Sequence, residues 1–73
     1  MDIGTELAIR AVITGLYSSG AVTTDQVRAI MTSLNEAAGA ALERREANSS
    51  KELTKLRKGI HLDTAVSPSP GDS

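Results

Sequence analysis

The chain has 73 residues and a net charge of −1, so it is limited to one small domain and is neither strongly basic nor strongly acidic. Cysteine, phenylalanine and tryptophan are absent, which excludes disulfides and thiolate metal sites and leaves the core to aliphatic side chains and alanine. The acidic start and the short apolar runs give no basis for a signal peptide or a membrane-spanning helix. We therefore expect a cytoplasmic protein without membrane contact.

A first helix is expected over residues 3–18, because apolar side chains recur there at helical spacing. At about 100° per residue, one face carries Thr5, Ala8, Ile9, Val12, Ile13 and Leu16. Arg10 and Leu7 lie on the opposite side, where Leu7 is a candidate contact to a partner or to a third helix. Gly20 can adopt a positive φ without a Cβ clash, so we expect it to end the helix.

A second helix is expected over residues 24–47, and its start signal is the clearest in the chain. Thr23 and Gln26 form the T-x-x-Q pattern of a capping box. The apolar stripe that follows consists of Val27, Ile30, Met31, Leu34, Ala38, Ala41 and Leu42. The alanine-rich residues 37–41 either pack closely against another helix or form a solvated extension. We favour close packing, because the apolar stripe continues through them.

A third, shorter helix is expected over residues 50–59. Ser49 and Glu52 have the spacing of a second capping box, and Gly59 is a candidate stop. The narrow apolar stripe of this helix consists of Leu53, Leu56 and Ile60. The alternative is that the second helix continues through residues 48–50 as one long helix.

These elements predict an all-α fold, namely an antiparallel hairpin of two helices with a short third helix, in a single domain over residues 1–62. Residues 63–73 contain two prolines and no apolar periodicity, so we expect a disordered tail. An isolated hairpin cannot cover both apolar stripes, which favours a homodimer with a four-helix-type bundle over a monomeric three-helix bundle. The expected interface consists of Leu7, Ile9, Val12, Ile13, Leu16, Val27, Ile30, Met31, Leu34, Ala38 and Ala41.

Charge is unevenly distributed along the chain. Residues 44–61 contain six basic and two acidic residues, whereas residues 1–43 contain two basic and five acidic ones. The candidate contacts to an anion or a nucleic acid are Arg44, Arg45, Lys51, Lys55, Arg57 and Lys58. Five of these six cations fall in the expected last turns of helices, where the helix dipole favours positive charge. No aromatic side chain is interleaved with them for base stacking, so nucleic-acid binding is the less favoured hypothesis.

The sequence contains no pattern typical of a catalytic, cofactor-binding or metal-binding site. His61 is the single histidine, and we interpret it as a solvated side chain although Asp63 follows two residues later. Tyr17 is the single aromatic residue and is expected to cover the end of the helical bundle. We therefore predict a protein that is not an enzyme and that uses no metal or cofactor.

The apolar helical faces predict a small module for protein–protein interaction or oligomerisation, with a second copy or another helical protein as its partner. The alternative is a small nucleic-acid-binding or regulatory factor that uses residues 44–58. Phosphate binding weakens steeply with salt, whereas association through apolar helices does not, so the two hypotheses are separable by experiment.

Overall fold

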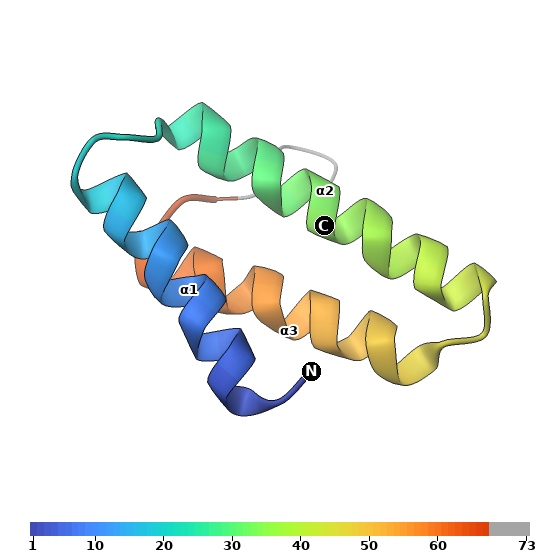
Figure 1. Ribbon diagram of the computed structural model, residues 1–73. Coiled ribbons are helices and arrows are strands. Elements are labelled where there is room, and N and C mark those ends of the chain that lie inside the picture. Colours follow the sequence, from blue (N-terminus) through green and yellow to red (C-terminus); the bar gives the residue numbers. More distant parts are fainter. Residues whose placement is uncertain (68–73) are drawn as a thin grey trace.

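The computed structural model describes residues 1–67, and within that range the chain forms three helices and no strand. The helices are α1 (Ile3–Ser18), α2 (Thr24–Glu43) and α3 (Ala47–Thr64). α2 and α3 run antiparallel and pack along most of their length, whereas α1 crosses α3 and diverges from α2 beyond the corner that joins them (Figure 1). The predicted all-α class is confirmed. The predicted hairpin of the first two helices is not confirmed.

The corner between α1 and α2 contains the glycine stop that the sequence predicts. Gly20 has a φ of 82°. Its amide donates to the carbonyl oxygen of Tyr17 at 3.2 Å, and the amide of Ala21 donates to that of Leu16 at 2.9 Å. These two bonds close the end of α1 in a Schellman motif, in which a left-handed residue satisfies the last carbonyl groups of the helix.

α2 begins at the predicted capping box. The amide of Gln26 donates to Thr23 Oγ1 at 3.1 Å, and the amide of Thr23 donates to Gln26 Oε1 at 2.7 Å. Two amides that would otherwise lack a partner at the helix start are thereby paired. The hydroxyl groups of Tyr17 and Thr24 are 3.1 Å apart and hydrogen-bonded, which ties the end of α1 to the start of α2.

The turn between α2 and α3 lies earlier in the chain than predicted. α2 ends at Glu43 rather than at residue 47, and α3 begins at Ala47 rather than at residue 50. Arg45 has a φ of 61°, and its amide donates to the carbonyl oxygen of Leu42 at 2.9 Å. The chain therefore reverses through the same kind of left-handed cap as at Gly20, with arginine in the place that glycine usually takes.

The capping box predicted at Ser49 and Glu52 is wrong, because α3 has already begun before Ser49. The cap position is Glu46, whose side chain makes no capping hydrogen bond. Glu52 instead forms an ion pair with the amino group of Met1. The alternative of one helix that continues through residues 48–50 is also wrong, since the reversal lies just before them.

α3 is 18 residues long because Gly59 does not end it. Gly59 is buried in the middle of the helix, where a Cβ atom would stand 2.6 Å from Nε of Arg10. Glycine is thus needed here for the close approach of an arginine from α1 rather than for a turn. The helix continues to Thr64, and Ala65 follows it with a φ of 60°.

The segment after α3 returns to the core. Val66 is buried, its amide donates to Thr64 Oγ1 at 3.2 Å, and its carbonyl oxygen accepts from Nδ1 of His61 at 2.6 Å. His61 is therefore a half-buried capping group rather than the solvated side chain that we expected. The prediction of a disordered tail is wrong for residues 63–67, and for residues 68–73 it lies outside the described residues.

The buried core lies between α2, α3 and the segment after α3. Its buried apolar side chains are Val27, Met31, Leu56, Ile60 and Val66. α1 adds only partly buried side chains, namely Ile9, Ile13 and Tyr17. Because α3 is nearly as long as α2, it provides the antiparallel partner that the sequence analysis assigned to the first helix. α1 is consequently covered on one side only.

Candidate interaction surface

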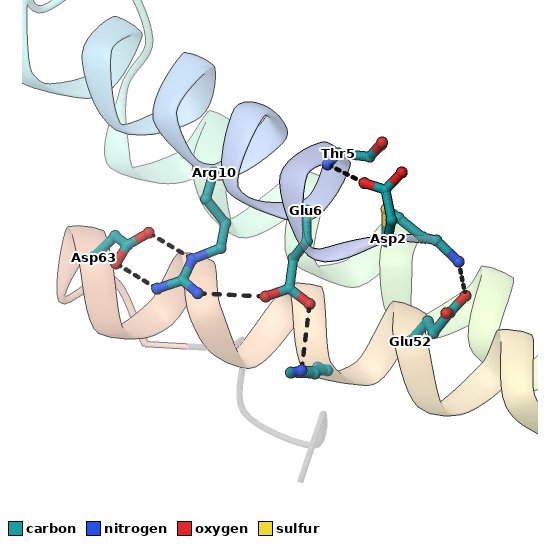
Figure 2. Close-up of polar contacts among 8 residues, drawn as sticks. Asp2, Thr5, Glu6, Arg10, Glu52 and Asp63 are labelled. Atoms are coloured by element: carbon teal, nitrogen blue, oxygen red, sulfur yellow. Dashed lines mark hydrogen bonds and ion pairs between the residues drawn. The ribbon is translucent and has the colours of Figure 1, made fainter.

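The two charged residues of α1 both point toward α3 (Figure 2). Arg10 binds the carboxylate of Asp63 with two hydrogen bonds of 2.8 Å, from Nε and from Nη2. Its Nη1 also donates to Glu6 Oε2 at 3.4 Å. Glu6 is only 5% exposed, and Lys55 Nζ lies 4.0 Å from its other carboxylate oxygen. The polar contacts of α1 are therefore made within the chain itself.

The ion pair between Arg10 and Asp63 holds both groups in their charged forms. Hydrogen bonds from the guanidinium group lower the pKa of Asp63, and the carboxylate in turn raises the pKa of Arg10. At the start of the same helix, the amide of Thr5 donates to Asp2 Oδ1 at 2.7 Å and lowers the pKa of Asp2. This bond caps the first turn of α1.

The opposite side of α1 is uncharged and exposed. We call it the outer face of α1, and it consists of Ile3, Gly4, Leu7, Ala8, Ala11, Val12, Gly15 and Leu16. The four large aliphatic residues of this face are between 42% and 61% exposed. The buried side of α1 is rotated by about a quarter turn from the predicted one, because Glu6 and Arg10 turn inward and displace Val12 and Leu16 outward.

Two shallow hollows show where neighbouring helices leave apolar surface uncovered. One lies on α1, has a volume of about 240 Å³ and is lined by Ala8, Ile9, Val12 and Ile13. The other has a volume of about 300 Å³ and is lined by Ala37, Ala40, Ala41, Arg44, Glu46, Ser49 and Leu53. In the alanine-rich stretch, Ala38 and Ala41 are buried as expected, whereas Ala37 and Ala40 are exposed.

The predicted interface residues separate into three groups. Buried within the chain itself are Val27, Met31, Ala38 and Ala41. Partly buried against the core are Ile9, Ile13, Ile30 and Leu34. Exposed on the outer face of α1 are Leu7, Val12 and Leu16. The third group is the most exposed of the three, and Ile3, which the predicted set lacked, is exposed beside it.

The six basic candidates do not form one surface. Lys51, Lys55 and Lys58 line a hollow of about 450 Å³ together with Leu42, Ala47, Ser50 and Thr54. Arg44 lines a different hollow, and Arg45 lies in the turn between α2 and α3. Because α3 extends to Thr64, Lys55, Arg57 and Lys58 lie in mid-helix, so our explanation of these cations by the helix dipole is wrong.

The sequence analysis missed the ion pair between Arg10 and Asp63, which positions α1 on α3. One available signal was the spacing of Glu6 and Arg10, since residues four apart share a helix face and these are the only charges in the helix. The other residue of the pair, Asp63, belongs to the segment that the sequence predicts as a disordered tail, so no contact with the first helix is expected of it.

Residues 1–67 contain no group of three or more histidine, cysteine or acidic residues placed to hold a metal ion. Within the same range, no helix combines the length and the apolar character needed to cross a membrane. Comparisons with protein-family models, with curated proteins and with solved structures gave no match.

Proposed function

We propose that this protein is a small, non-enzymatic interaction module that associates through the outer face of α1, with itself as a homodimer and with other helical proteins. The observation that supports the proposal most strongly is the distribution of charge in α1. Its two charged side chains are turned inward to α3, and four large aliphatic side chains are exposed instead.

Such a helix is unusual on the surface of an isolated domain. A helix that faces water normally carries charged and polar residues on its outer side, whereas one that is apolar on nearly all sides is normally buried. Contiguous exposed apolar patches of this kind mark interaction surfaces. The partner surface must itself be apolar, because the outer face of α1 offers no charge to a charged partner.

The size of the face sets the expected strength of self-association. A helix of 16 residues is about 24 Å long and about 10 Å wide, so two copies of α1 cover a few hundred Å² of each other. Stable complexes bury about 800 Å² per partner. We therefore expect a weak dimer that dissociates on dilution, and a larger helical partner can bind more tightly to the same face.

The test compares two substitutions of the same type at exposed leucines. Leu7→Glu places a charge on the outer face of α1, whereas Leu62→Glu places it on α3, where the leucine is even more exposed, at 77% against 50%. Molar mass is measured by light scattering over a concentration series in high salt. We expect the wild type and Leu62→Glu to approach two chains at high concentration, and Leu7→Glu to remain at one chain.

A monomeric wild type at all concentrations, or equal behaviour of the two variants, would contradict the proposal of self-association through α1. The arrangement of the basic residues gives less support to the alternative, a nucleic-acid-binding factor, since they are distributed over different surfaces. That alternative predicts binding to a nucleic acid that weakens steeply with salt.

A further inference from the structure

The lysine side of α3 consists of Lys51, Lys55 and Lys58, which recur at helical spacing. Lys51, Lys55 and Lys58 line one hollow, and no acidic residue is among its lining side chains. Within residues 1–67, Lys51 and Lys58 have no carboxylate partner, and Lys55 has only Glu6 at 4.0 Å. Lys55 and Lys58 lie in mid-helix, so they do not stabilise the end of a helix.

The exposed side of α2 carries the opposite charge at the same spacing. Glu36 and Glu43 are both exposed and lie seven residues apart on one side of the helix, as Lys51 and Lys58 do on α3. Seven residues correspond to about 10.5 Å along a helix. Neither glutamate has an ion-pair partner within residues 1–67.

We propose that α3 of one copy binds α2 of a second copy through these complementary charges. In the antiparallel arrangement, Lys51 faces Glu43 of the second copy and Lys58 faces its Glu36. Between the two pairs lies Gly39, where even an added Cβ would meet no atom within 4 Å. This small residue leaves room for the long side chain of Lys55.

Such a contact joins two different surfaces of the same protein. It is therefore heterologous, and it extends to further copies unless the geometry closes into a ring. The net charge of −1 favours association, because the copies do not repel each other strongly. This contact is independent of the outer face of α1, and the two differ in salt dependence, since only the charged contact is screened.

Other anionic partners fit the lysine side less well. Single-stranded nucleic acids are held by aromatic side chains that stack on bases, and the single aromatic residue, Tyr17, hydrogen-bonds Thr24 at the corner between α1 and α2. A lipid surface requires a broad apolar face beside the cations, and the large aliphatic side chain in the hollow is Leu42 alone.

The test reverses charge on each surface and then on both. The first variant is Lys51→Glu/Lys58→Glu, the second is Glu36→Lys/Glu43→Lys, and the third combines all four changes and so keeps the net charge of the wild type. The control, Arg44→Glu/Arg45→Glu, changes net charge as much as the first variant but leaves the proposed contact intact. Mass-average molar mass is measured for each at about 20 mM and about 500 mM salt.

We expect the wild type, the control and the fourfold variant to form larger species in low salt, with apparent association at least about tenfold weaker in high salt. The two single-surface variants should show no such species. Failure of the fourfold variant to recover association would overturn the proposal, as would loss of association in the control. A dimer that persists in high salt reports on α1 instead, so the two proposals fail separately.

Discussion

Replacement of Gly59 by alanine tests how closely α1 lies on α3. In an exposed helix this change raises the free energy of unfolding by about 1 kcal/mol, because alanine loses less backbone entropy on folding. At Gly59, however, the new Cβ atom would stand 2.6 Å from Nε of Arg10 and 2.8 Å from its Cδ and Cζ. These atoms must shift, which disturbs the two-bond pairing of Arg10 with Asp63. We therefore expect Gly59→Ala to give no net stabilisation in the wild type.

The same substitution should stabilise the protein once the guanidinium group is removed. In an Arg10→Ala background the three atoms nearest to the new Cβ are absent, so Gly59→Ala should raise Tm by about 4–8 °C, which corresponds to the helix propensity gain in a domain of this size. The matched control is Gly39→Ala, in a helical position with no atom within 4 Å of the new Cβ. It should raise Tm equally in both backgrounds. Thermal unfolding followed by circular dichroism measures all these variants.

A gain of 4–8 °C from Gly59→Ala in the wild type, equal to that in the Arg10→Ala background, would refute the inferred packing. It would mean that the arginine does not lie across Gly59 in solution, and that α1 is placed on α3 in another way.

Three further outcomes follow from the caps, the core and the ion pair. Arg45→Gly should raise the free energy of unfolding by about 1 kcal/mol, because Arg45 has a φ of 61° and glycine adopts this conformation without a Cβ penalty; urea unfolding measures it. Val66→Ala should cost about 2 kcal/mol, since Val66 is buried, whereas Val12→Ala at an exposed site should change stability by less than about 0.5 kcal/mol. The pKa of Asp63 in the folded state lies below its ordinary value of 3.8, so the ion pair with Arg10 stabilises the fold above that value and the stabilisation is lost as pH falls through the folded pKa. Asp63→Asn should therefore reduce the loss of stability between about pH 5 and pH 2 in acid titrations of unfolding.

The features that the sequence predicts correctly are local ones. The capping box at Thr23 and Gln26 and the glycine stop at Gly20 depend on residues within one or two turns, so their patterns are visible without knowledge of the fold. The first helix has the predicted bounds for the same reason. Apolar spacing in α2 likewise indicates Val27 and Met31 correctly as core residues.

The features that the sequence analysis missed depend on contacts between distant residues. A glycine at position 59 is typical of a helix stop. In the structure it lies within α3, where the absence of a Cβ atom leaves room for Arg10 of α1. Val66 follows a helix end and precedes two prolines, and only the fold shows that it is buried beneath α2 and α3. The pairing of α2 with α3 likewise depends on the length of α3. The capping box predicted at Ser49 and Glu52 places the start of this helix too late, so the predicted helix is too short.

For the candidate surface, the sequence indicated a partner-facing role for Leu7 but placed the buried side of α1 incorrectly. Apolar residues occupy so much of the circumference of this helix that spacing alone does not define one face. The ion pairs of Glu6 and Arg10 determine which side of α1 is buried, because their partners, Lys55 and Asp63, lie on α3.

The central claim is that the outer face of α1 is the surface through which copies associate. Methyl NMR spectra recorded over a dilution series in high salt test it most directly, since each aliphatic residue reports separately and the charged contact of α3 is screened. The account predicts concentration-dependent shifts at Leu7, Val12 and Leu16 and none at Leu62. Shifts confined to Leu62 or to residues of α2, or spectra that do not change with concentration, would contradict it.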